Sequence, residues 1–235
     1  MKRFWEIDLL RALAIIGMIV FHLFFVLDFY DVFKQDLSEG LWHILARIVQ
    51  FIFIGLVGVS LALSRQKGGN FYKKQLKRGL TVLGAGLLVS VGTWFVVEEF
   101  VRFGILHFIG ASILIGQFFA GFRFLNLILA AASFFAGQYV EGISTEFPPL
   151  YIFGFDYGSI NTIDYFPIFP WISMVFLGIF LGNVFFRNGV RRFDVRDLRM
   201  PKFVNFLSKH SLLIYLLHVP IIVAIIFLIQ SILTV

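Results

Sequence analysis

Three residues in the first apolar stretch of the chain have side chains that could carry out chemistry. Asp8, Arg11 and His22 lie in the segment DLLRALAIIGMIVFH, whose other residues are apolar. An α-helix turns about 100° per residue, so the step from Arg11 to His22 returns to nearly the same face, about 16 Å along the axis. Asp8 precedes Arg11 by three residues and can pair with it. The sequence therefore predicts a helix with one polar face, which must look into a bundle of helices.

Each of these residues also has a purely structural interpretation. Near a membrane surface, Arg11 could extend its guanidinium into water and Asp8 could cap the helix. His22 lies deeper, where a neutral imidazole could bond to a neighbouring helix. Ionisable side chains inside a membrane are costly and usually serve a function, so we treat all three as candidate catalytic residues.

Four further polar residues in or beside apolar stretches are candidates for substrate binding: Arg47, His107, Asp164 and His218. His218 comes two residues before Pro220, whose missing N–H leaves one helix carbonyl without its usual donor. The five histidines include no pair three or four residues apart, and the chain has no cysteine. Closely spaced ligands on one helix are a common mark of metal sites, so we expect no metal ion. A site gathered from several helices is the alternative.

The composition indicates that these residues are held inside a membrane. Of the 235 residues, 59% are hydrophobic and only 14% are charged, whereas a soluble domain has about a quarter charged residues. Apolar stretches of about 20 residues, the length of a membrane-spanning helix, recur along the chain. We therefore predict an all-α fold, a polytopic membrane helix bundle that forms a single domain over residues 1–235. The net charge of +6 does not indicate nucleic-acid binding, because the basic residues lie in short loops.

Seven membrane spans are expected, at about 8–28, 41–63, 79–97, 103–121, 124–140, 165–185 and 210–234. With these spans, 16 of the 20 basic residues fall on one side of the membrane, among them Lys2, Arg3 and the six in 65–78. Basic residues are retained in cytoplasmic loops. The N-terminus is therefore expected in the cytoplasm and the C-terminus outside, in a multi-pass protein of the cell membrane.

The two longest loops carry expectations of their own. The outer loop 141–164 is rich in glycine, proline and aromatic residues, and we expect it to pack over the outer mouth of the bundle. The inner loop 187–209 alternates arginine with aspartate and apolar residues. This pattern favours a short amphipathic helix lying on the anionic lipid surface.

An acidic residue, an arginine and then a histidine in the first membrane helix resemble the motif of the transmembrane acyltransferase superfamily. Four segments narrow the resemblance: RFWEIDLLRALAIIGMIVFHLFFVLDFY, FGILHFIGASILIG, DYFPIFPWISMVFLGIFLGN and HSLLIYLLHVPII. In this order they span the chain. Together they resemble small prokaryotic members of the heparan-alpha-glucosaminide N-acetyltransferase catalytic-domain family.

The resemblance implies an acyltransferase that moves an acyl group, expected to be acetyl, from cytoplasmic acyl-CoA to an acceptor at the outer face. The acceptor would offer a hydroxyl or an amine, and a carbohydrate or glycolipid is expected. By match to the motif, His22 would be the catalytic base or a transient acyl carrier, and Arg11 would bind the CoA phosphates or the pantetheine, with Asp8 beside it. Relatives commonly have ten or more spans, so a second subunit could complete the site in a homodimer.

The basic loop 65–78 is expected on the same side as a cytoplasmic donor. Lys73, Lys74 and Lys77 are candidates for holding the phosphates of acetyl-CoA, which is polyanionic. A purely orienting role of these lysines in the membrane is the alternative.

Two other functions fit parts of the sequence. A small transporter or channel could line a polar path with His22, Arg47, His107 and Glu98, but the inverted repeats and broken helices of many transporters are not evident. A non-catalytic membrane scaffold would leave the shared face of Arg11 and His22 unexplained. Binding of acetyl-CoA separates these functions, because only the enzyme is expected to be stabilised by it.

Overall fold

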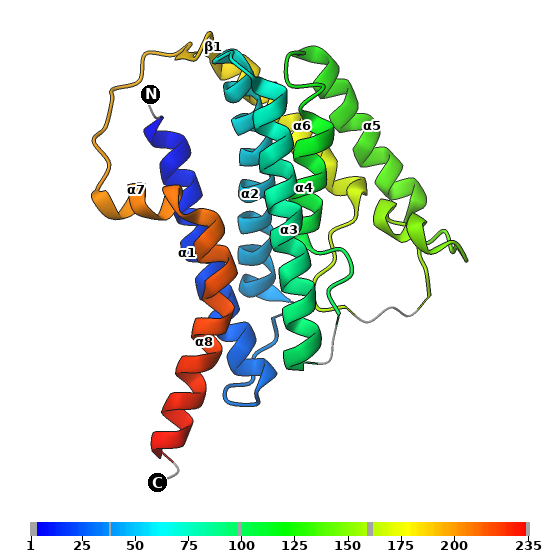
Figure 1. Ribbon diagram of the computed structural model, residues 1–235, viewed down its shortest axis with the longest axis vertical. Coiled ribbons are helices and arrows are strands. Elements are labelled where there is room, and N and C mark those ends of the chain that lie inside the picture. Colours follow the sequence, from blue (N-terminus) through cyan, green and yellow to red (C-terminus); the bar gives the residue numbers. More distant parts are fainter. Residues whose placement is uncertain (1–3, 38, 98–99, 159–161, 234–235) are drawn as a thin grey trace. The chain divides into compact units, whose positions relative to one another are not determined.

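The computed structural model of the chain describes residues 4–37, 39–97, 100–158 and 162–233, and these are almost entirely helical (Figure 1). Lys2, Arg3 and Glu98, which the sequence analysis used, lie outside the described residues. The helices are α1 Trp5–Phe29, α2 Gly40–Gln66, α3 Phe71–Val97, α4 Ile105–Gly116, α5 Phe124–Val140, α6 Ile168–Phe185, α7 Lys202–Lys209 and α8 Ser211–Leu233. A 3-10 helix, η1, covers Pro148–Phe153, and a short antiparallel hairpin joins β1 Phe186–Arg187 to β2 Val190–Arg191. The predicted all-α class is confirmed.

A helix is present in each of the seven predicted spans. Among the described residues, α1, α2, α3, α6 and α8 are long and apolar enough to cross a membrane, whereas α4 has 12 residues and α5 has 17. The chain is therefore a multi-pass membrane protein, and the count of seven spans stays a prediction. The fourth helix is shorter than the predicted span 103–121, because turns follow Gly116. The buried amide of Asn126 stabilises these turns by donating to the carbonyl oxygens of Phe119 and Phe122.

The contacts of the chain divide it into two compact units, which are described separately. The first unit consists of Met1–Phe53 with Arg196–Val235, and the second of Ile54–Val195. The first half of α2 thus belongs to the first unit and its second half to the second.

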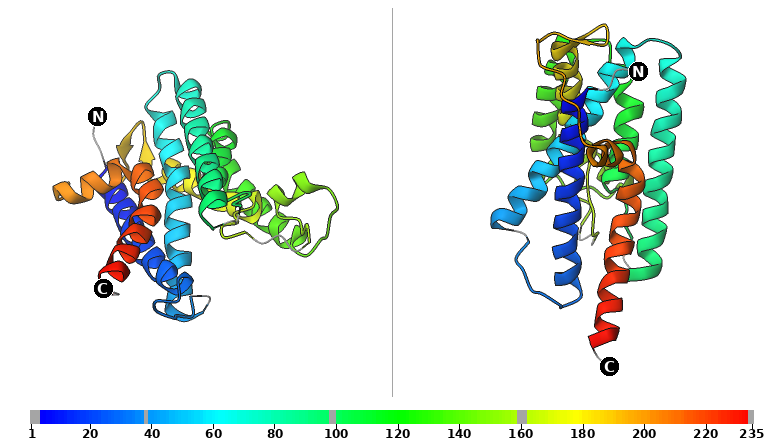
Figure 2. Two further views of the ribbon diagram at one scale, coloured as in Figure 1. Left: turned by 60° about the horizontal axis from the view of Figure 1, so that its bottom comes forward. Right: turned by 90° about the vertical axis from the view of Figure 1, so that its left-hand side faces the viewer.

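In the first unit, α1 packs lengthwise along α8, and α7 lies crosswise to them (Figures 1 and 2). Two apolar clusters hold these helices together. One is formed by Ala12, Ile15 and Leu207, and the other by Val26, Ile222 and Ile226. Another side of α1 meets α2, where a Cβ added at Gly17 would lie 2.7 Å from Val49 Cγ2. Both faces of α1 are therefore used in packing within this unit.

Helix α7 lies in the inner loop where a short amphipathic helix was predicted. Leu207 and Ser208 on one face are buried, whereas Lys202 and Lys209 are exposed to solvent. Its crosswise direction is the one expected of a helix lying on a membrane surface. The position of α7 on the inner leaflet stays a prediction.

In the second unit, α3 pairs with α4 and α5 pairs with α6 (Figure 1). Glycines allow α2 and α6 to cross with their backbones in contact. A Cβ added at Gly58 would collide with the carbonyl oxygen of Val175, and one added at Gly178 with that of Gly55. Only residues without a side chain fit at this crossing, as at many helix contacts in membranes.

Side-chain amides join the ends of the helices in the second unit. Gln66 Nε2 donates to Asn183 Oδ1 at 3.0 Å and to the carbonyl oxygen of Phe186 at 3.1 Å. Asn183 Nδ2 in turn donates to the carbonyl oxygens of Ala120 and Phe122. These bonds satisfy carbonyl groups that helix ends leave open. The end of α2, the turn after α4 and the β1–β2 hairpin are thereby tied together.

Candidate functional site

The first unit brings His22 of α1 and His218 of α8 into contact. Their ring centroids lie 4.6 Å apart, and the rings are nearly perpendicular. Other aromatic rings pack on the pair. The ring centroid of Phe21 lies 5.6 Å from that of His22, and the ring centroid of Tyr215 lies 5.5 Å from that of His218. His218 is buried, with 7% of its surface exposed, and His22 is partly buried. Two candidates that the sequence placed in separate roles thus form one pair.

Backbone carbonyls determine which nitrogen of each ring carries hydrogen. Nδ1 of His22 lies 2.9 Å from the carbonyl oxygen of Met18, and Nδ1 of His218 lies 2.6 Å from that of Tyr215. A carbonyl oxygen can only accept, so each Nδ1 donates its hydrogen. A neutral imidazole with hydrogen on Nδ1 carries its lone pair on Nε2. Each ring therefore offers a basic Nε2, and that of His218 is buried without a hydrogen-bond partner among the described residues.

The histidine pair lies between the two apolar clusters of the α1–α8 contact. On α1, Ile15 of one cluster precedes His22 and Val26 of the other follows it. On α8, Ile214 packs on the first cluster and Ile222 belongs to the second. The two histidines are thus polar side chains in an otherwise apolar helix contact. Charge that develops there would meet little water, which strengthens electrostatic interactions.

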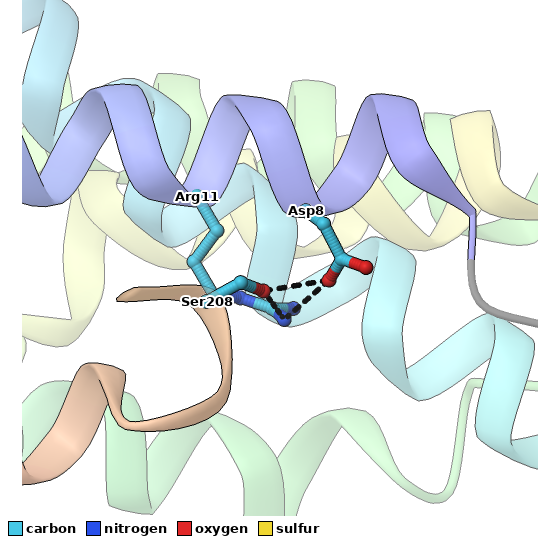
Figure 3. Close-up of polar contacts among 3 residues, drawn as sticks. All are labelled: Asp8, Arg11 and Ser208. Atoms are coloured by element: carbon cyan, nitrogen blue, oxygen red, sulfur yellow. Dashed lines mark hydrogen bonds and ion pairs between the residues drawn. The ribbon is translucent and has the colours of Figure 1, made fainter. Parts of the chain in front are cut away.

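A second polar cluster lies nearer the N-terminus on the same side of α1, where Figure 3 shows Asp8, Arg11 and Ser208 of α7 meeting. Ser208 Oγ donates to Asp8 Oδ1 at 2.6 Å and accepts from Arg11 Nη1 at 3.1 Å. Arg11 Nη1 also lies 3.9 Å from Asp8 Oδ1. The side chain of Arg11 is 22% exposed and that of Asp8 is 7% exposed. The hydroxyl therefore bridges a buried carboxylate and a partly exposed guanidinium.

This cluster gives Asp8 and Arg11 a structural role, because it fixes α7 against α1. It also shows which way the shared face of α1 points. Arg11 contacts α7 through Ser208, and His22 contacts α8 through His218. The face predicted from helical spacing is thus the face toward the α7–α8 segment.

Ser208 is a residue that the sequence analysis missed. It lies in the segment FLSKHS, where a serine beside a lysine near a predicted membrane surface gives no distinct signal. A weak clue was available, because a buried acid and an arginine in a membrane helix need polar partners from another helix.

Arg47, the remaining candidate in the first unit, lies on an exposed face of α2. Its Nε donates to His43 Nε2 and its Nη1 to Gln50 Oε1, both at 3.4 Å. These contacts give the Arg47 guanidinium polar partners on its own helix. No contact of Arg47 with the histidine pair is found among the described residues, and its role in substrate binding stays a prediction.

His107 lies in the second unit, near the start of α4. Its ring packs against α3, where a Cβ added at Gly86 would lie 3.1 Å from His107 Nδ1. This Nδ1 and the hydroxyl of Ser112 are both buried and lack hydrogen-bond partners among the described residues. Gln117, just after the end of α4, donates to the carbonyl oxygen of Leu114. A role of His107 in substrate binding stays a prediction.

Asp164 caps the N-terminus of α4. Its Oδ2 accepts from the backbone N–H of Ile105 at 2.9 Å and lies directly over Gly104. Burial raises the pKa of the Asp164 carboxyl to about 6, against the lowering effect of the Ile105 hydrogen bond. A carboxylate at this end of a helix also interacts favourably with the helix dipole. Asp164 thus has a structural task, and its predicted substrate contact stays a prediction.

The lysines proposed for the donor phosphates lie on the first turns of α3 in the second unit. Lys73, Lys74 and Lys77 are all exposed, and no ion pair involving them occurs among the described residues. The guanidinium of Arg65 lies nearby, 5.5 Å from the ring of Phe71. These cations form a basic surface that could attract polyanions.

Comparison with known proteins assigns the chain to a family. The family model described as "Heparan-alpha-glucosaminide N-acetyltransferase, catalytic" matches residues 3–220. The matched region includes both histidines of the pair and the Asp8–Arg11–Ser208 cluster. No curated protein and no solved structure gives a significant match.

Proposed function

Because the chain belongs to the heparan-alpha-glucosaminide N-acetyltransferase catalytic-domain family, we propose that it transfers an acetyl group from acetyl-CoA to an acceptor hydroxyl or amine. The chain is a membrane protein of an acyltransferase family. The donor, the reacting residue and the direction of transfer, from the cytoplasm to the outer side, belong to the proposal. A carbohydrate or glycolipid is the proposed acceptor class.

The observation that carries the proposal is the state of His22. Its Nδ1 is bonded to the Met18 carbonyl, so Nε2 is left with a lone pair in a largely apolar contact between helices. Such a nitrogen can attack a thioester or accept a proton. A scaffold protein would need neither property at the centre of a helix contact.

Arg11 is proposed to bind the donor, because it lies on the same side of α1 as His22. Its guanidinium is partly exposed, about 16 Å from His22 along the helix. This separation is roughly that of an extended pantetheine arm. A guanidinium can hold phosphate oxygens in a planar fork that an ammonium cannot match. In this proposal, the Arg11 guanidinium would bind the donor while it also donates to Ser208 Oγ.

The lysines at the start of α3 are proposed to concentrate the polyanionic donor near the membrane surface. Long-range attraction of this kind raises association rates and weakens with salt. Changing Lys73, Lys74 and Lys77 together to Gln should therefore weaken acetyl-CoA binding at low salt and have less effect at high salt. Unchanged binding at low salt would leave these lysines an orienting role only.

Acetyl-CoA binding to the purified protein is the first test. A ligand at 100 times its dissociation constant stabilises a protein by about 2.7 kcal/mol, which a thermal unfolding scan detects. The wild-type protein and His22→Asn should both be stabilised, whereas Arg11→Ala should be stabilised less. The wild type should release acetate or acetylate an acceptor, whereas His22→Asn should do neither, because it keeps a donor to the Met18 carbonyl but lacks the basic nitrogen. His210→Asn, outside the pair, is the matched control. Full transfer by His22→Asn would refute the assignment.

A further inference from the structure

The histidine pair offers two basic nitrogens, whereas a single catalytic histidine would supply only one. His22 Nε2 and His218 Nε2 both carry lone pairs, and the rings lie 4.6 Å apart. Burying a polar nitrogen without a partner is unfavourable. The Nε2 of His218, which has no partner among the described residues, is therefore available to accept a proton from a substrate.

The hydrogen bonds of the pair limit what His22 can do alone. If His22 Nε2 carries the acyl group, its Nδ1 still holds the hydrogen that the Met18 carbonyl accepts. An acylated imidazole in this state has no lone pair left on the ring. It cannot also take the proton of the acceptor, so a second base is required.

We propose, on the basis of the acetyltransferase function above, that His22 is the acyl carrier and that His218 is the base that deprotonates the acceptor. His218 fits this role because its Nε2 carries a lone pair, lies in the ring next to His22 and has no other partner among the described residues. No carboxylate of the described residues bonds to either ring. The Tyr215 carbonyl fixes His218 Nδ1 as a donor and so keeps its Nε2 basic.

The two steps balance as follows. His22 Nε2 attacks the thioester carbonyl carbon, the carbon–sulfur bond breaks, and the CoA thiolate leaves and takes a proton from water. The acceptor oxygen or nitrogen then attacks the acyl carbon while His218 Nε2 takes its proton. The bond between the acyl carbon and His22 Nε2 breaks, which restores neutral His22. His218 finally returns its proton to water, so the net reaction converts acyl-CoA and acceptor to acylated acceptor and CoA.

The test separates the two steps with His218→Asn, whose amide can still donate to the Tyr215 carbonyl but offers no base. Labelled CoA and unlabelled acetyl-CoA are mixed with the protein, and exchange of the acetyl group reports the first step alone. Release of acetate reports transfer to water. Formation of acetohydroxamate reports transfer to hydroxylamine, which attacks acyl groups without help from a base. His210→Asn again serves as the matched control.

We expect His218→Asn to exchange acetyl groups within about threefold of the wild-type rate, which also shows that the variant is folded. Acetate release should fall about 10²–10⁴-fold, the usual effect of losing a general base. Transfer to hydroxylamine should stay near the wild-type rate. His22→Asn should lose all three activities, and His210→Asn should keep them.

Three results would overturn this inference alone: unchanged acetate release by His218→Asn, equal loss of exchange and acetate release in that variant, or acetate release by the wild type without exchange. The last result would mean direct transfer without an acyl carrier. If the wild type showed none of the three activities, the proposed acetyltransferase function would fail together with the inference.

Discussion

Replacement of Ser208 by Ala should loosen α7 from α1 without unfolding the rest of the protein. The change removes the hydrogen bond to Asp8 Oδ1 at 2.6 Å and the one from Arg11 Nη1 at 3.1 Å. Hydrogen bonds to charged groups contribute about 1.5–3 kcal/mol, whereas bonds between helices inside membranes average about 0.6 kcal/mol. Asp8 is only 5% exposed, so water cannot readily replace the lost hydroxyl. We therefore expect a cost of about 2 kcal/mol, which corresponds to a factor of about 30 in the equilibrium for undocking.

The absence of cysteine in the chain allows this opening to be measured directly. A single cysteine at Leu207, which is buried against Ala12 and Ile15, should react with a water-soluble maleimide only when α7 undocks. Labelling of Leu207→Cys should become about 30-fold faster when Ser208→Ala is added. Ser231→Ala is the matched control, because Ser231 lies near the end of α8 and its hydroxyl donates to the carbonyl oxygen of Leu228 in the same helix. Equal labelling rates with and without Ser208→Ala would refute the view that this cluster holds α7.

Three further predictions concern the second unit. Asp164→Asn should remove a pH dependence of stability, because the folded pKa of the Asp164 carboxyl, about 6, exceeds its unfolded value of 3.8. The wild type should therefore be most stable below about pH 4 and lose up to about 3 kcal/mol of stability relative to Asp164→Asn as the pH rises through 6. Thermal scans from pH 4 to 8 measure this loss, and parallel pH dependences of the two proteins would contradict it. Gly178→Ala should destabilise the protein by about 3 kcal/mol or more in denaturant titrations, because its Cβ meets the Gly55 carbonyl, whereas Gly84→Ala, with open space around it, should be neutral or slightly stabilising. Single cysteines at Gly69 and Thr145 should be labelled from opposite sides of the membrane, and labelling from the same side would overturn the predicted topology.

Local features of the site could be predicted because they depend on one helix at a time. The shared face of Arg11 and His22 follows from their spacing, and all the predicted spans contain helices because apolar stretches of that length are distinctive. The end of α4 was predicted less well. Asn126 of the following helix orders the turns that come after α4, and the apolar residues of these turns resemble those of a span.

The partners of the site could not be predicted, because they come from distant parts of the chain. Ser208 lies 200 residues from Asp8, and His218 is similarly remote from His22. Their pairing depends on how α7 and α8 pack against α1, which spacing within a segment does not determine. The division of the contacts into two compact units also depends on packing, and a single domain over residues 1–235 stays a prediction. His107 and Asp164 lie in one unit and the histidine pair lies in the other.

The side of α1 that meets α7 and α8 has a consequence for how this helix can change. Its contact positions, from Asp8 through Ala12, Ile15, Ile19 and His22 to Val26, advance in alternating steps of four and three. Steps of this kind place every position on one seam. Substituting an apolar residue leaves the seam in place, whereas deleting one residue after Arg11 would turn His22 about 100° away from His218 while Arg11 stayed at Ser208. Even a seven-residue insertion, which would keep both residues on one face, would move His22 about 10 Å along the axis away from His218. The number of residues between Arg11 and His22 is therefore under stricter constraint than the identities of those residues.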